Sequence, residues 1–156
     1  MNNFKWTNPQ LPLPADVAEC FSGKPKLIGL AVWDEIYRLR TNRLEADGTG
    51  ILESPWWFTS RTFSQIVGRA TRANVRITTS ARSGLAVPPR FNTDFDTLVV
   101  FQILVPGFAY CGQASPQKWM KDGNTLLSGG MEQLWIPGLQ KEEVRFKFFG
   151  NIEDRI

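Results

Sequence analysis

Histidine is absent from the 156-residue sequence. Without an imidazole, the chain has no Ser-His-Asp triad, no Cys-His pair and no histidine-based zinc site. Only two cysteines are present, Cys20 and Cys111, and they lie far apart in the sequence. We interpret them as buried thiols; a disulfide is the less favoured alternative, and no metal site is expected. An enzyme with this composition would have to use carboxylates, hydroxyl groups and arginines.

Long apolar runs are also absent. No stretch approaches the roughly 18 residues that a membrane-spanning helix needs. The N-terminal sequence MNNFKWTNPQLPLP lacks the charged region and apolar core of a signal peptide. We therefore expect no membrane association. The expected location is the cytoplasm, either that of the producing cell or that of a target cell reached without a classical signal peptide.

Acidic residues are missing from one segment of the chain. Six arginines and no Asp or Glu lie between Arg61 and Arg90, in a protein whose net charge is only +3. Such a patch favours an anionic partner: phosphate, nucleic acid or an acidic protein surface. A solvated helix face that binds nothing is equally compatible with the pattern.

The length suits one domain, with an extended and partly helical segment at residues 1–30 and a core at residues 31–149. A short helix is expected within residues 14–21. A second helix follows Thr59 or Ser60, either of which can cap it. Its apolar face has the i, i+3, i+4, i+7 spacing of an amphipathic helix and consists of Phe63, Ile66, Val67 and Ala70.

Strands are expected where apolar, aromatic or β-branched residues alternate or run together. They lie at residues 33–39, 55–60, 75–79, 98–105, 108–113, 131–136 and 143–149. Loops are expected at 81–96 and 115–130, and the length of the second favours a functional role. About seven strands with two early helices predict an α+β fold built on a pair of mostly antiparallel sheets.

Three short motifs in this pattern carry polar groups suited to chemistry. The first is Tyr37-Arg38 at the end of a strand, and the second is Phe58-Thr59-Ser60, where an aromatic strand opens into a helix. The third is Glu132, the second residue of the expected strand at 131–136, which directly follows two glycines in the stretch SGGMEQLWIPG. Core packing explains the apolar residues of that strand but gives no reason for the carboxylate. We expect the two glycines to act as a hinge for the preceding loop.

In this order, the three motifs resemble the Arg…Ser…Glu branch of the ADP-ribosyltransferase toxin superfamily. The likeness is greatest to the small toxin domains of bacterial conflict systems. The resemblance covers most of residues 31–149 and implies split antiparallel β-sheets, NAD⁺ as a co-substrate and no metal. It also assigns Glu132 as the catalytic carboxylate, which would stabilise the oxocarbenium-like ribose formed when the nicotinamide bond breaks. The alternative is an ordinary glutamate at an exposed strand start.

The other NAD-binding residues implied by the resemblance are Arg38, with its neighbour Tyr37, and Thr59, Ser60 and Trp57. The Arg38 guanidinium would hold the pyrophosphate or ribose region, unless it forms a structural salt bridge with Asp34 or Glu35. Thr59 and Ser60 would order the pocket around Glu132 and nicotinamide, a role compatible with helix capping. Trp57 or Phe58 could stack on the nicotinamide ring, although core packing is favoured for both.

The loop at 115–130 lies where this superfamily recognises its acceptor. Its candidate contacts are Lys118, Trp119 and Met120; an exposed Trp119 could stack on a base or bind a protein patch, or it could fold back onto the sheet. Members that modify arginine usually carry a second acidic or amide residue two positions before the catalytic glutamate. Gly130 occupies that position, which argues against arginine as the target.

The resulting prediction is a monomeric, NAD-dependent ADP-ribosyltransferase that acts as a bacterial toxin or effector on a protein or nucleic acid. An NAD glycohydrolase toxin is the alternative enzyme. The non-enzymatic alternative is a catalytically inactive relative or a basic nucleic-acid-binding module. The resemblance also implies a neutralising immunity or antitoxin protein as a partner.

Overall fold

A computed structural model describes residues 13–40, 54–87, 96–119 and 125–152, apart from the side chains of 118–119 and 125–126. The helices are α2 (Ala15–Ala18), α3 (Ser60–Ala73), α4 (Ile77–Leu85) and the 3-10 helix η1 (Lys141–Glu143). The strands are β1 (Lys26–Leu30), β2 (Glu35–Arg40), β3 (Trp56–Trp57), β4 (Thr97–Ile103), β5 (Gly107–Gln113), β6 (Gln117–Trp119), β7 (Thr125–Leu127), β8 (Glu132–Trp135) and β9 (Val144–Asn151).

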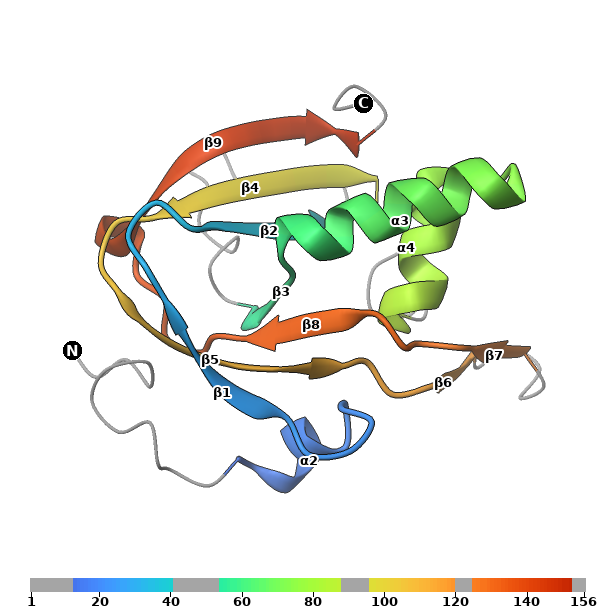
Figure 1. Cartoon of the computed structure of the whole chain (residues 1–156), viewed down its shortest axis with the longest axis horizontal. Helices are drawn as coiled ribbons and strands as arrows, with labels where there is room; N and C mark the ends of the chain where they lie inside the picture. The colour runs from blue at the N-terminus through green and yellow to red at the C-terminus, as the bar shows by residue number, and fades with distance from the viewer. Residues whose placement is uncertain (1–12, 41–53, 88–95, 120–124, 153–156) are drawn as a thin grey trace.

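The strands form two main sheets and a small hairpin. One sheet has the order β1-β5-β8-β3, the second has the order β2-β4-β9, and β6 pairs with β7. All of these pairs are antiparallel. Figure 1 shows the two main sheets as separate layers, with α3 and α4 near one end and α2 beside β1 and β5. The predicted α+β class with split antiparallel sheets is therefore confirmed.

Apolar side chains from both sheets meet in a first core. Its largest fully buried members include Ile36, Trp57 and Leu134. The predicted central strand at 98–105 is β4, which lies between β2 and β9 and is buried at all seven positions. A β-branched, apolar run is the pattern expected of a strand that is covered on both faces.

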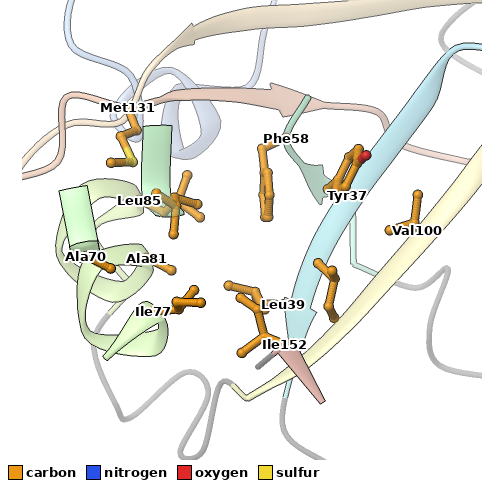
Figure 2. Packing of buried hydrophobic residues seen from close by; sticks show 12 residues of the cluster. Tyr37, Leu39, Phe58, Ala70, Ile77, Ala81, Leu85, Val100, Met131 and Ile152 are labelled. Carbon is orange, nitrogen blue, oxygen red and sulfur yellow. The ribbon is translucent and has the colours of Figure 1, made fainter. Parts of the chain in front are cut away.

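A second core joins the helices to the other face of β2 and β4. Figure 2 shows its side chains converging from α4, β2 and β4, with Phe58 and Met131 among them. The predicted amphipathic helix is α3, in which Ile66 and Ala70 are buried and Phe63 and Val67 pack at the edge of this core. This core fixes the helices against the strands that carry the first two motifs.

The prediction of a strand at 75–79 and a loop at 81–96 is wrong for the described part of that region. Ile77–Leu85 form helix α4 instead. Ile77, Ala81 and Leu85 are all buried and follow an i, i+4, i+8 spacing, so docking onto the core overrides the β-branched composition. The Ser80 hydroxyl also donates to the carbonyl of Ile66 on α3 at 2.9 Å. Residues 88–95 lie outside the described part.

Two other predictions differ from the structure. The expected loop at 115–130 contains the antiparallel strands β6 and β7, which pair Gln117 with Leu127. No strand is expected before residue 33, whereas β1 pairs with β5 along its whole length. Its pattern of exposed and buried residues does not alternate cleanly, which removes the usual strand signal. Within the described residues, no helix is long and apolar enough to cross a membrane.

Candidate active site at the junction of the two sheets

The first two motifs meet where the two sheets diverge. Tyr37 of β2 and Phe58, just after β3, exchange two backbone hydrogen bonds of 2.8 Å each. One residue before this bridge, Trp57 pairs with Leu134 of β8, the strand that Glu132 begins. The structure therefore brings all three motifs to one junction, although the second and third are more than 70 residues apart in the sequence.

The N-terminus of α3 ties the second motif to the third. Thr59 is the N-cap, and its side chain accepts a hydrogen bond from the Thr62 N–H at 3.3 Å, which confirms the expected cap. The buried hydroxyl of Thr62 donates to the backbone carbonyl of Glu132 at 2.9 Å. Ser60 is exposed in the first turn of α3. Thr62, which the sequence analysis did not single out, is thus the hydroxyl that positions the start of β8.

A cavity of about 590 Å³ opens at this junction. Arg38, Trp57 and Phe58 line it, together with Ser115 and Gln133. Other walls come from α2 and from the end of α4. Among the predicted site residues, Arg38 and Trp57 are therefore brought into one cavity.

The remaining predicted NAD-binding and catalytic residues do not line the cavity. Tyr37 lies in the helix-side core, where its ring stacks on those of Phe58 and Phe63 at centroid distances of 6.0 and 5.3 Å. Thr59, Ser60 and Glu132 lie beside the cavity rather than on its wall.

Arg38 is a mostly buried cation inside the cavity wall. Its guanidinium lies over the Trp57 ring, 5.4 Å from the ring centroid, and donates to the Ser54 carbonyl at 3.3 Å. Burial, and then the charge of Arg40, lowers the pKa of Arg38 to about 10. A bound anion would offset both effects.

The two carboxylates considered as structural partners of Arg38 are engaged elsewhere. Asp34 accepts a hydrogen bond from the Ala31 N–H at 2.7 Å. Glu35 accepts from the Tyr37 hydroxyl at 2.8 Å and forms an ion pair with Lys147 at 3.6 Å.

Trp57 contributes a second polar group to this wall. The residue is only 1% exposed, and its Nε1 has no hydrogen-bond partner among the described residues. A buried N–H without a partner is costly, so such groups point to ligands or to ordered water. The Trp57 N–H is itself buried, so Arg38 is the group of this pair that offers positive charge and hydrogen-bond donors to an anionic ligand.

Glu132 is half-buried at the start of β8 and faces β5. Glu132 lies diagonally across from Cys111 on the same face of the sheet, since Cys111 pairs with Leu134 and Glu132 pairs with Gln113. Burial, and then the influence of the Glu132 carboxylate, raises the pKa of the Cys111 thiol to about 12. Cys111 and Cys20 are both free, half-buried thiols. Among the described residues, no group of acids and cysteines is arranged to hold a metal ion.

Gln133, the residue after Glu132, is a cavity residue that the sequence analysis missed. Its Nε2 donates to the carbonyl of Cys20 at 2.9 Å, which ties β8 to the end of α2. The Ser115 hydroxyl adds a second tie by donating to the Glu19 carbonyl at 2.8 Å. Strand alternation offers the only sequence signal: if Glu132 faces one side of β8, Gln133 faces the other.

The two glycines before β8 are held rather than free to hinge. The N–H groups of Gly129 and Gly130 donate to the carbonyls of Ser83 and Ala114, both at 2.8 Å. Gly129 and Gly130 have φ values of +67° and +93°, in the region that favours glycine. The structure therefore does not show the expected hinge. The two glycines instead let the chain run between α4 and the end of β5 in a tight, hydrogen-bonded conformation.

The predicted acceptor residues lie largely outside the part of the chain that the structure describes. Lys118 and Trp119 belong to β6 and pair with Leu126 and Thr125 of β7. Their side chains, and the whole of Met120, lie outside the described residues. Gly130 is exposed, and a Cβ added to it would have no neighbouring atom within 4 Å.

The acid-free segment forms a basic surface on the helices. Arg61, Arg69 and Arg72 of α3 are exposed, as is Arg76 before α4. No ion pair joins these four side chains to a described residue. Only Arg61 lies in the turn of α3 that begins beside Glu132.

Comparison with known proteins finds similar folds among solved structures. No protein-family model and no curated protein matches the sequence. The fold is similar to that of Tne2, solved in complex with Tni2, with a TM-score of 0.55 and 14% identity over 84% of this chain and 95% of that one. It is also similar to Rhs1-CT, solved in complex with its cognate immunity protein RhsI1, with a TM-score of 0.53 and 15% identity over 82% of this chain and 81% of that one.

Proposed function

We propose that this chain is the toxic domain of a bacterial toxin–immunity pair and that it is an NAD-dependent ADP-ribosyltransferase. It would cleave the nicotinamide–ribose bond of NAD⁺ and transfer ADP-ribose to a protein or nucleic acid. The proposal rests on the junction where the two sheets diverge. It gathers Arg38, Trp57 and the Glu132 strand around one cavity, in the order that the sequence resemblance implies.

The cavity fits a dinucleotide substrate in size and in polarity. Its volume of about 590 Å³ lies within the range of about 300–1,000 Å³ typical of small-molecule sites. Arg38 would hold the pyrophosphate through its guanidinium fork, with its guanidinium supported by the Trp57 ring.

The bond that breaks joins ribose C1′ to the pyridinium nitrogen. The bonding electron pair moves to that nitrogen and leaves neutral nicotinamide. The acceptor forms the new bond to C1′ and loses a proton. The positive charge that develops on the ribose is the difficult species, and the Glu132 carboxylate would stabilise it from the start of β8. The bond from Thr62 to the Glu132 carbonyl would keep that carboxylate in position.

NAD glycohydrolase activity, in which water is the acceptor, is the second candidate. Gly130 favours it, since this exposed position offers no side chain to activate a macromolecular acceptor. The two candidates share the cleavage step and differ only in what attacks C1′.

A neutralising protein partner is part of the proposal. Rhs1-CT, whose fold is similar, was solved with a cognate immunity protein. The exposed arginines of α3 would suit a partner with an acidic surface.

The test is to incubate the purified protein with NAD⁺ and host extract, to quantify released nicotinamide, and to search protein and RNA by mass spectrometry for added ADP-ribose. We expect nicotinamide release that Glu132→Gln reduces by a factor of about 100 or more, as for loss of a major electrostatic stabiliser. Glu142→Gln, at an exposed position on η1, is the matched control and should have wild-type activity. Modified macromolecule supports the transferase, and free ADP-ribose supports the glycohydrolase. No turnover, with salt-sensitive nucleic-acid binding instead, would support the non-enzymatic alternative.

A further inference from the structure

The outward face of α3 carries a stripe of arginines. Arg61 and Arg72 share the side of the helix that lies opposite its buried residues, and Arg69 flanks them; all three are exposed. At a rise of about 1.5 Å per residue, Arg61 and Arg72 stand about 16 Å apart along the helix axis. Figure 1 shows α3 running from the junction of the sheets toward one end of the molecule. The stripe therefore extends from the junction outward.

Neither helix supplies a charge that would neutralise these arginines. No Asp or Glu occurs in α3 or α4. Among the described residues, none forms an ion pair with Arg61, Arg69 or Arg72. Three like charges held along one helix raise the local positive potential, which attracts a partner with closely spaced negative charges.

Gly68 leaves room for one of these side chains on the outward face. A Cβ at this position would lie 3.2 Å from Nη1 of Arg72, closer than such contacts usually are. The guanidinium of Arg72 therefore lies back over the preceding turn, on the side of Arg61. Glycine is a poor helix former, but at this position it lets a guanidinium lie along the stripe.

The other exposed side chains of α3 are polar or small, and they favour nucleic acid over a protein as the partner. They are Ser60, Ser64, Gln65, Thr71 and Ala73. A protein interface usually has apolar or aromatic residues at its centre, and the exposed residues of α3 include none. Nucleic-acid interfaces are polar and strongly positive, and Ser, Thr and Gln donate to phosphate oxygens together with Arg. An acidic protein would match this face in charge alone, whereas nucleic acid matches it in both charge and polarity.

We infer that the outward face of α3 binds the phosphate backbone of a nucleic acid and that, on the basis of the proposed function, this nucleic acid is the acceptor of ADP-ribose. Arg61 precedes Thr62, whose hydroxyl donates to the Glu132 carbonyl. A strand that follows the arginines along α3 would therefore reach the carboxylate assigned to catalysis. A base nitrogen of that strand would form the bond to ribose C1′ as nicotinamide leaves, and its proton would pass to water.

The test measures binding of a fluorescein-labelled oligonucleotide, as single-stranded RNA and as duplex DNA, by anisotropy over a range of salt concentrations. The variant is Arg69→Gln with Arg72→Gln, which keeps good helix formers on α3. For a single strand, we expect the slope of log affinity against log salt to become shallower by about 0.7 for each lost contact. At about 0.1 M salt the affinity should fall by a factor of about 20 or more.

Transfer of ADP-ribose to the same oligonucleotide should fall in step with its binding. The matched control is Lys24→Gln with Lys141→Gln, which removes the same net charge at two exposed positions outside α3. It should bind nucleic acid and transfer ADP-ribose nearly as the wild type does. Circular dichroism verifies that both double variants are folded.

Each other result has a separate meaning. If the wild type releases nicotinamide from NAD⁺ but binds neither oligonucleotide, or if the arginine variant binds them with the wild-type affinity and salt slope, the inference fails while the proposed function stands. If a polyglutamate peptide binds through these arginines and neither oligonucleotide does, the partner of α3 is an acidic protein and the inference fails. If the arginines bind nucleic acid but the protein does not consume NAD⁺, the binding surface stands, and the acceptor role fails together with the proposed function.

Discussion

Cys111 on β5 and Glu132 on β8 are diagonal neighbours on one face of the sheet, because Cys111 pairs with Leu134 and Glu132 pairs with Gln113. Because burial and the Glu132 charge both oppose the thiolate, the pKa of Cys111 is raised to about 12. The thiol should thus remain protonated, and poorly reactive, throughout the range in which an ordinary cysteine reacts. This relationship provides a direct test of where the Glu132 side chain points.

We predict that Glu132→Gln accelerates alkylation of Cys111, because the substitution removes the charge that opposes its thiolate. The acceleration should be partial, since burial is the larger cause of the raised pKa. The measurement is iodoacetamide labelling at pH 8, followed by peptide mapping. Cys20 is the internal control, because its pKa responds to Asp16 and Glu19 rather than to Glu132. An unchanged Cys111 rate in a folded Glu132→Gln protein would contradict the described orientation.

Thr62→Val should reduce both stability and NAD⁺ turnover. The variant keeps the shape of the side chain and removes the hydroxyl that donates to the Glu132 carbonyl at 2.9 Å. Loss of a buried hydrogen bond of this kind costs about 1–3 kcal/mol. Thr62→Ser keeps the hydroxyl and should recover most of the activity. Thermal unfolding measures the loss of stability, and nicotinamide release measures the loss of turnover. If Thr62→Val had wild-type turnover, the position of the Glu132 backbone would not depend on this bond.

Several elements could be predicted because their signals are local. The run from Leu98 predicts a buried central strand, and Thr59 predicts a helix cap; both are confirmed. The strand that begins at Glu132 is confirmed as well. In each case, hydrophobic pattern or capping chemistry agrees with the tertiary environment.

Other features depend on contacts that no local pattern contains. The start of helix α4 is predicted as a strand, because Ile77 and the threonines after it favour strands, and the rest is predicted as a loop. Only docking against α3 and β2 reveals the helix. The order of three motifs indicated which segments meet, but not which side chains line the cavity. Gln133 enters it because α2 packs over that face of β8, a contact that no local pattern in the sequence indicates.

The paired glycines before β8 should differ sharply in their tolerance of alanine. Gly130→Ala meets no atom within 4 Å, so its cost should be only that of a positive φ, about 1–2 kcal/mol. Gly129→Ala has the same kind of strain, and its Cβ would also collide with the carbonyl oxygen of Ala114. We expect a further loss of about 1–3 kcal/mol for that overpacking. Thermal unfolding of the two variants, measured side by side, checks the order. Equal losses of stability would show that the passage between α4 and β5 is looser than described.

Binding of an anionic dinucleotide should weaken as pH rises through about 10, the value to which burial and Arg40 lower the pKa of Arg38. Below that pH the guanidinium is charged and can hold the pyrophosphate; above it, the free protein increasingly carries the neutral form. NADH is a suitable probe, because it carries the same pyrophosphate and lacks the cationic leaving group. Arg38→Gln should bind weakly at every pH and show no such transition.

Deprotonation of Arg38 should lower the affinity for NADH without destabilising the folded protein. Its folded pKa lies below the ordinary value of 12.5, so between the two values the unfolded chain binds more protons, and this group makes stability increase with pH. The raised pKa of Cys111 acts in the opposite direction between its ordinary value of 9.0 and about 12, because there the folded state binds more protons. Circular dichroism is therefore recorded at each pH of the NADH titration, and only affinities measured on folded protein are compared. Constant affinity from pH 8 to pH 11 in folded protein would mean that Arg38 is not the group that holds the phosphates.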